Sequence, residues 1–112
     1  GSGSARREFL HVEDLADACL FLMDTYSGIG HLNVGTGVDV TIRGLAEMIR
    51  DLVHPVAELT FDTSRPDGMP RKVLDVSRLT GLGWTAGIPL ADGLASTYDW
   101  FCEALDSGAA RL

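Results

Sequence analysis

The sequence has few positive charges, no long apolar run and little that resembles a secretion signal. Its 112 residues hold 9 Lys and Arg against 16 Asp and Glu, a formal net charge of −7 at pH 7. This negative charge argues against nucleic acid and acidic membrane surfaces as partners. No apolar run approaches the ~20 residues that a helix needs to cross a bilayer. No apolar segment follows the first positive charges, so we expect no signal peptide.

Cysteine is scarce as well. Cys19 and Cys102 each lie in a segment with helical periodicity, and free cysteines are among the most buried residue types. We therefore expect two buried thiols and no disulfide, which is typical of a reducing cytoplasm. With 46% hydrophobic and 22% charged residues, the chain has the composition of a globular protein. Its length suits one small domain, residues 1–112.

Helical and extended patterns alternate along the chain. Apolar residues at helical spacing predict three main helices, at 12–25, 42–53 and 89–105. The predicted core face of the first contains Val12, Leu15, Ala16, Cys19, Leu20 and Met23, and that of the last contains Leu90, Leu94, Tyr98, Phe101 and Leu105. Short extended segments are predicted at 7–12, 31–34, 59–61 and 73–76. The expected fold class is α/β, a small mixed domain of about three main helices and short strands.

Several residues are suited to begin these helices. Thr41 is a good N-cap for the helix at 42–53, and Pro89 suits the first turn of the last helix. Ser77 is predicted to cap a short helix at 78–82. His11 precedes the first helix, where a capping or core role is favoured over metal binding. Trp84 is expected in the core.

The stretch from Phe61 to Val76 places three positive charges in a loop stiffened by two prolines. These charges are Arg65, Arg71 and Lys72. An arginine can bond two phosphate oxygens at once, so the loop suits a phosphate-bearing ligand. A solvated loop with ordinary surface charges explains the same residues, and the spacing alone leaves both interpretations open.

Three blocks of sequence resemble the C-terminal region of GDP-L-fucose synthase, an extended short-chain dehydrogenase/reductase. They are REFLHVEDLA at 7–16, HLNVGTG at 31–37 and SRPDGMPRKVLDVSRLTGLGW at 64–84. The resemblance implies a domain that binds a GDP-linked deoxyhexose. It implies that Arg7 holds the diphosphate or the sugar and that Asp67 bonds the nucleotide side. Of Arg71 and Lys72, one would face the ligand while the other pairs with Asp75.

Without the resemblance, Arg7 reads as an exposed arginine that pairs with Glu8 or Glu13 and contributes little. The resemblance also leaves alternatives: a non-enzymatic module that oligomerises or binds a nucleotide sugar, or part of another nucleotide-sugar epimerase. The Pro66–Asp75 block argues against the last. Gly1–Ala5 has the composition of a linker, but the family carries a similar loop ahead of its Arg-Glu-Phe, which favours a native origin.

The family's NADP site and reaction centre find no match in the sequence. The G-x-G runs beginning at Gly1, Gly28, Gly35 and Gly81 all lack the third glycine of G-x-G-x-x-G. The family's catalytic tyrosine and lysine stand four residues apart, whereas Tyr26 and Tyr98 are followed at that spacing by Gly30 and Cys102. We therefore expect no cofactor, no metal and no catalytic residue in this chain, which would not be catalytically competent alone.

The strand predicted at His31–Val34 would have a bare edge in this chain. Unpaired edges invite pairing with another chain. This predicts a homo-oligomer formed through His31–Val34. Gly35-Thr36-Gly37, which follows, resembles a phosphate cradle only superficially, because no lysine follows at the required spacing.

Overall fold

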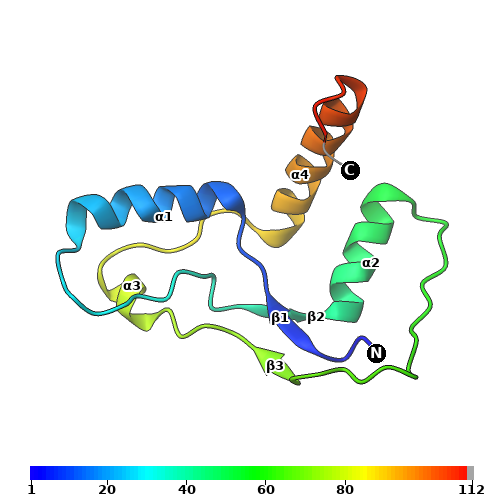
Figure 1. Ribbon diagram of the computed structural model, residues 1–112, viewed down its shortest axis with the longest axis horizontal. Helices are drawn as coiled ribbons and strands as arrows, with labels where there is room; N and C mark the ends of the chain where they lie inside the picture. Colours follow the sequence, from blue (N-terminus) through cyan, green and yellow to red (C-terminus); the bar gives the residue numbers. More distant parts are fainter. Residues whose placement is uncertain (111–112) are drawn as a thin grey trace.

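The computed structural model describes residues 1–110, which form three short strands and four helices (Figure 1). In chain order the elements are β1 (Arg6–Glu8), α1 (Val12–Thr25), β2 (Asp39–Thr41), α2 (Ile42–Val53), β3 (Arg71–Lys72), α3 (Ser77–Gly81) and α4 (Leu90–Asp106). This mixture confirms the predicted α/β class. The three main helices begin and end close to where their periodicity placed them.

The strands form one small sheet in the order β2-β1-β3. β1 runs antiparallel to β2 and parallel to β3. The register sets Arg7 opposite Val40 on one side and opposite Lys72 on the other. β1 therefore pairs with β2 and also with β3, which lies more than sixty residues further along the sequence.

The strands predicted at 31–34, 59–61 and 73–76 are wrong, because these residues form no regular strand. A strand needs a neighbouring backbone to complete its hydrogen bonds. Arg71 and Lys72, predicted as loop, find one in β1 and become β3. His31 and Asn33 are instead tied to the α3 region by side chains: Arg78 Nη1 donates to the His31 carbonyl at 2.7 Å, and Asn33 Nδ2 donates to the Asp75 carbonyl at 3.0 Å. The predicted bare strand edge is therefore wrong, whereas the homo-oligomer through His31–Val34 stays a prediction.

Helix α1 has the predicted bounds, but its buried face was predicted wrongly. His11 caps the helix as expected, with Nδ1 accepting from the Glu13 amide at 3.3 Å. Asp14 and Ala18 are the buried residues, whereas Leu20 and Met23 are 65% and 81% exposed. The predicted core stripe therefore faces outward among the described residues, and α1 is covered on its opposite side.

The core lies between α1 and the α3 region. Ala18, Leu79 and Trp84 are its buried residues, which confirms the prediction for Trp84. The Trp84 Nε1 group donates to Asp17 Oδ2 at 2.8 Å, so the indole is packed and also hydrogen-bonded. The buried Asp14 carboxylate accepts from the Gly87 and Ile88 amides at 3.1 and 3.0 Å, which ties α1 to the segment before α4.

Helices α2 and α3 differ in how they begin. Thr41 Oγ1 accepts from the Gly44 amide at 2.9 Å, which confirms the predicted cap of α2. Ser77 is the first residue of α3, not its cap, and Val76 takes the N-cap position without a side-chain bond. The carboxylate of Asp75 accepts from the Ser77 amide at 3.0 Å and so takes part in this turn.

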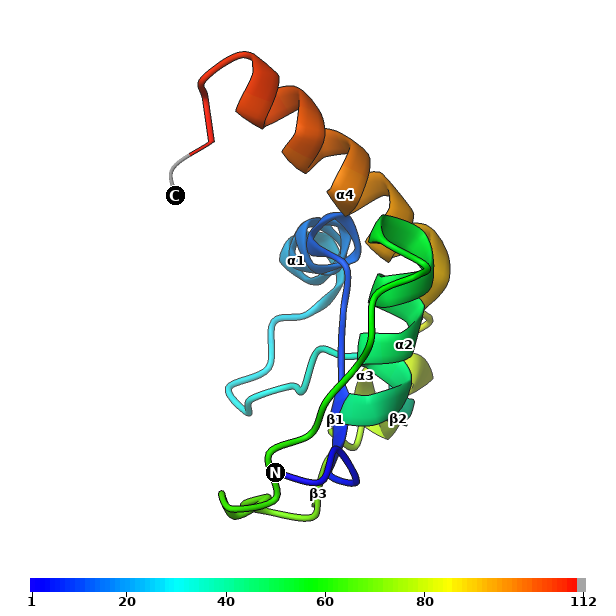
Figure 2. The same cartoon turned by 90° about the vertical axis from the view of Figure 1, so that its right-hand side faces the viewer.

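Helix α4 follows Pro89 and projects beyond the other elements (Figures 1 and 2). Its predicted buried stripe is incomplete, because Phe101 and Leu105 remain 36% and 41% exposed. The radius of gyration is 16.8 Å, against about 13 Å for a compact domain of this length. The described residues thus form an open arrangement in which much apolar surface stays uncovered.

The cysteines are free, as predicted, but they are not buried as predicted. Cys19 is exposed and Cys102 is half-buried. Cys19 shares the outward-facing side of α1, which explains why its helical position did not bury it. Within residues 1–110, no helix combines the length and the apolar character needed to cross a membrane.

Candidate functional site

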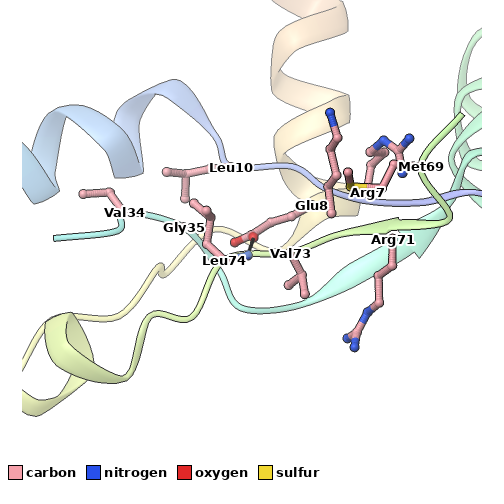
Figure 3. A pocket seen from close by; sticks show the side chains of 10 residues that line it. Arg7, Glu8, Leu10, Val34, Gly35, Met69, Arg71, Val73 and Leu74 are labelled. Carbon is pink, nitrogen blue, oxygen red and sulfur yellow. Dashed lines mark hydrogen bonds between the residues drawn. The ribbon is translucent and has the colours of Figure 1, made fainter. Parts of the chain in front are cut away.

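A pocket of about 820 Å³ lies beside β1 and β3 (Figure 3). β3 is an edge strand of the sheet and belongs to the third sequence block, residues 64–84. Typical small-molecule sites enclose roughly 300–1,000 Å³. The lining combines charged and apolar side chains: Arg7, Glu8, Leu10, Val34, Gly35, Met69, Arg71, Lys72, Val73 and Leu74. All three blocks that carried the family resemblance contribute to it.

Arg7 and Lys72 are the pocket's cross-strand pair of positive charges. They are register partners across β1 and β3. Arg7 Nη1 donates to the Arg6 carbonyl at 2.6 Å, and within residues 1–110 neither Arg7 nor Lys72 forms an ion pair. Two adjacent cations without a carboxylate partner favour an anion at this place.

Glu8 fixes the pocket wall and is not a free carboxylate. Its Oε1 accepts from the Thr36 amide, from the Gly37 amide at 2.8 Å and from Thr36 Oγ1 at 3.3 Å, while its Oε2 accepts from the Leu74 amide at 2.7 Å. Burial acts to raise the pKa of Glu8, but the bonds from Leu74, Gly37 and Thr36 together outweigh burial, so this pKa lies below its usual value. Glu8 is ionised at neutral pH and joins three separate segments.

Arg71 is paired, but with a different residue from the one expected. Its Nε donates to Asp39 Oδ2, and Asp39 Oδ1 accepts from Arg6 Nε at 2.7 Å. The predicted alternative, Asp75, accepts instead from the Ser77 amide. The hydrogen bonds from Arg71 and then Arg6 hold the pKa of Asp39 below its usual value. Figure 3 shows the Arg71 side chain turned away from the side on which Arg7 lies.

Asp67 lies outside this pocket. It lines a second pocket of about 410 Å³, together with Arg7 and residues of the first loop. Its carboxylate accepts from the Ser2 hydroxyl at 2.7 Å and from the Ser2 amide at 2.5 Å, and these two bonds lower the pKa of Asp67. Arg7 is therefore the only one of the four predicted site residues that lines both pockets. Asp67 is committed to the chain's own first residues.

Sequence reasoning missed two carboxylates that organise the site, Glu8 and Asp39. Glu8 directly follows Arg7 in the first sequence block, residues 7–16. Asp39 is flanked by Val38 and Val40 in a short apolar segment. A charged residue in such a segment is buried only with a partner. The position of Asp39 therefore indicates from the sequence alone that it pairs with a positive charge. The distant partners were not readable from the sequence.

The Gly35-Thr36-Gly37 turn, which superficially resembles a phosphate cradle, is occupied by a carboxylate of the chain itself. The Thr36 and Gly37 amides converge on the Glu8 carboxylate, as the Gly87 and Ile88 amides converge on Asp14, so both of these amide pairs are occupied by the chain's own carboxylates. A Cβ at Gly35 would clash with Glu8 Oε1, so the turn closes tightly over this side chain. Residues 1–110 also contain no cluster of three or more His, Cys, Asp and Glu able to hold a metal ion.

Comparison with known proteins agrees with the blocks and with the fold. The family model of the NAD dependent epimerase/dehydratase family matches residues 1–35. The chain adopts the fold of the GDP-L-fucose synthetase of Naegleria fowleri, solved bound to NADP, with a TM-score of 0.90 and 26% identity over 98% of this chain and 35% of that one. In sequence and fold the chain is thus similar to part of the extended short-chain dehydrogenases/reductases.

Within that superfamily, the sequence matches the C-terminal part of GDP-L-fucose synthases. It is 55% identical to GDP-L-fucose synthase 1 of Arabidopsis thaliana, over 92% of this chain and 32% of the relative. It is 50% identical to GDP-L-fucose synthase of Escherichia coli, over 95% of this chain and 36% of the relative. The chain thus spans about a third of the length of the curated relatives that it matches.

Proposed function

We propose that this chain is the substrate-binding part of a GDP-L-fucose synthase and that it holds the diphosphate of a GDP-linked deoxyhexose between Arg7 and Lys72. One observation carries the proposal. The two cations are opposite each other across β1 and β3, line the same pocket and have no carboxylate partner within residues 1–110. Neighbouring like charges repel, and a bound diphosphate relieves that repulsion.

The rest of the pocket suits the uncharged parts of such a ligand. Leu10, Val34 and Val73 provide apolar contacts near the cation pair. Met69, with its flexible thioether, can adapt to a sugar or a base. Glu8 is held by backbone amides, so it takes no part in binding and keeps the wall in place.

The full family reaction would need residues outside this chain. In the family, the NADPH-dependent enzyme epimerises GDP-4-keto-6-deoxy-D-mannose at C3 and C5 and then reduces C4. This chain contains no G-x-G-x-x-G and no tyrosine followed four residues later by lysine. We therefore propose that it contributes substrate binding, that NADP is held elsewhere, and that it is not catalytically competent alone. Its two free thiols support a cytoplasmic location.

The experiment is titration calorimetry of the chain with GDP-L-fucose. A dissociation constant of ~1 mM corresponds to only about −4 kcal/mol, so titrations must reach millimolar ligand. We expect saturable binding that is weakened in Arg7→Ala and in Lys72→Ala. Arg65→Ala removes the same charge from an exposed loop residue and is the matched control. Equal binding by all four proteins would contradict the assignment, and no binding by the unmodified chain would contradict the function.

The exposed apolar side of α1 indicates that another protein segment packs against this helix. Leu20 and Met23 belong to an apolar stripe that no described residue covers. Monomeric proteins rarely leave such a stripe open without a binding role. We propose that the catalytic part of the synthase covers it.

This docking is tested by mixing the chain with the remaining two thirds of the Escherichia coli synthase, expressed separately. We expect a complex that Leu20→Lys abolishes. Val56→Lys changes a residue that is 85% exposed beyond α2 and should leave the complex intact. A complex that tolerates Leu20→Lys would contradict docking through α1.

A further inference from the structure

Two pairs of positive charges stand side by side across β1 and β3. The register sets Arg6 opposite Arg71 and Arg7 opposite Lys72. Like charges directly opposite each other on neighbouring strands are destabilising. Each pair therefore favours a negative charge nearby, and the two pairs differ in where that charge comes from.

Asp39 supplies the negative charge for the first pair. Its two oxygens accept from the Nε groups of Arg6 and Arg71, and Arg6 Nη2 also donates to the Asp39 carbonyl at 3.1 Å. The Asp39 side chain is 5% exposed, whereas those of Arg6 and Arg71 are 46% and 61% exposed. A carboxylate so covered requires partners, so it keeps both arginines on its own side of the sheet.

The second pair has no such carboxylate among residues 1–110. Side chains alternate between the faces of a strand, so Arg7 and Lys72 extend to the side opposite Arg6 and Arg71. Arg71 also lines the pocket, and its bond to Asp39 holds its guanidinium away from the second pair. We propose, as a refinement that rests on the proposed function, that Asp39 is a specificity-determining residue. It acts as a built-in anion for Arg6 and Arg71 and confines a ligand's phosphates to Arg7 and Lys72.

The test uses inorganic pyrophosphate as the probe and the NMR signals of the arginine Nε–H groups as the readout. In the unmodified chain, pyrophosphate should shift the Arg7 signal and leave those of Arg6 and Arg71 in place. In Asp39→Asn the Arg71 signal should shift as well. Affinity should rise by up to about fivefold, the gain expected from one more partly exposed ionic contact.

Two variants separate this role from a general charge effect. Asp51→Asn makes the same change in net charge and releases Arg50, whose Nη2 lies 2.6 Å from the Asp51 carboxylate on α2. This control should gain no affinity. Combining Asp39→Asn with Arg71→Gln should return the affinity to that of the unmodified chain.

Three results would overturn the role of Asp39. They are no gain in folded Asp39→Asn, a gain that persists without Arg71, and an equal gain in Asp51→Asn. If circular dichroism shows that Asp39→Asn does not fold, the role of Asp39 is tested with two variants that keep Asp39. Arg71→Gln should keep pyrophosphate affinity within about twofold, and Lys72→Gln should weaken it further than that; the reverse order refutes the role.

The proposed function and this refinement fail separately. Absence of GDP-L-fucose binding by the unmodified chain would refute the function. The role of Asp39 is tested separately, with pyrophosphate as the only ligand, by comparing the shift of the Arg71 Nε–H signal in the unmodified chain and in Asp39→Asn. A chain that binds the nucleotide sugar while Arg71 responds equally with and without Asp39 would refute only the refinement.

Discussion

Replacing the half-buried Glu8 with glutamine should destabilise the protein far more than the same exchange at an exposed glutamate. The Glu8 carboxylate accepts from the backbone amides of Thr36, Gly37 and Leu74 with its two oxygens. Glutamine has a single side-chain oxygen. If that oxygen faces the glycine turn, the NH₂ group meets the Leu74 amide; if it faces Leu74, the NH₂ group meets the two turn amides. At least one amide therefore loses its acceptor.

The expected magnitude follows from these lost bonds. A hydrogen bond to a charged group contributes about 1.5–3 kcal/mol, and partial solvent access places Glu8→Gln near the lower half of that range, at about 2 kcal/mol. At roughly 4 °C per kcal/mol for a chain of this length, the melting temperature should fall by roughly 8 °C. Urea denaturation followed by tryptophan fluorescence measures the loss in free energy of unfolding.

The control is Glu47→Gln, at an exposed position of α2 with no hydrogen bond from its side chain among the described residues. It should change stability by less than about 0.5 kcal/mol. The pKa of Glu8 is lowered from 4.5, so its stabilisation is present above that pH and is lost as the pH falls through the lower folded value. The gap between the two proteins should therefore be widest near neutral pH. Equal losses in free energy of unfolding for Glu8→Gln and Glu47→Gln would refute the proposed stabilisation by the Glu8 carboxylate.

Three further predictions concern the core, a helix cap and pH. Leu79→Ala should lower the free energy of unfolding by about 2–5 kcal/mol because Leu79 is 1% exposed, and Leu82→Ala, at 40% exposed, should cost clearly less; similar urea midpoints would contradict the core. Thr41→Ala should cost about 1 kcal/mol and reduce helical circular dichroism by loss of the α2 cap, an expectation that unchanged stability would refute. The pKa values of Glu8 and Asp39 are both lowered from 4.5 and 3.8, so the urea midpoint should fall as the pH drops below about 4.5; a midpoint that stays constant or rises would contradict both assignments.

The helices were predictable because local rules define them. The bounds of α1 and α2 follow from apolar spacing, from the cap at Thr41 and from the acidic first turn of α1. The strands were not predictable in the same way. Arg71 and Lys72 carry no strand pattern, and they become β3 only because β1 passes alongside and accepts their pairing. Residues 31–34 have a strand pattern without a neighbour that would pair with them.

The candidate site was predicted in part. The sequence identified Arg7 and Lys72, which the structure brings together across two strands. It also identified Arg71 and Asp67, whose side chains the structure commits to Asp39 and to Ser2. Whether a charged group is available to a ligand depends on which opposite charge lies within hydrogen-bonding distance. That information depends on contacts between residues thirty to seventy positions apart.

The sequence by itself determined the α/β class, the extents of the helices, the family resemblance and the segments that would line a site. It did so because helix periodicity, caps and motif residues act over a few neighbouring positions. Only the tertiary structure decided which face of α1 is buried, which segments pair as strands, and which of the cations remain without a partner. These outcomes depend on long-range packing and on the distances between charges, and neither quantity is encoded in local spacing.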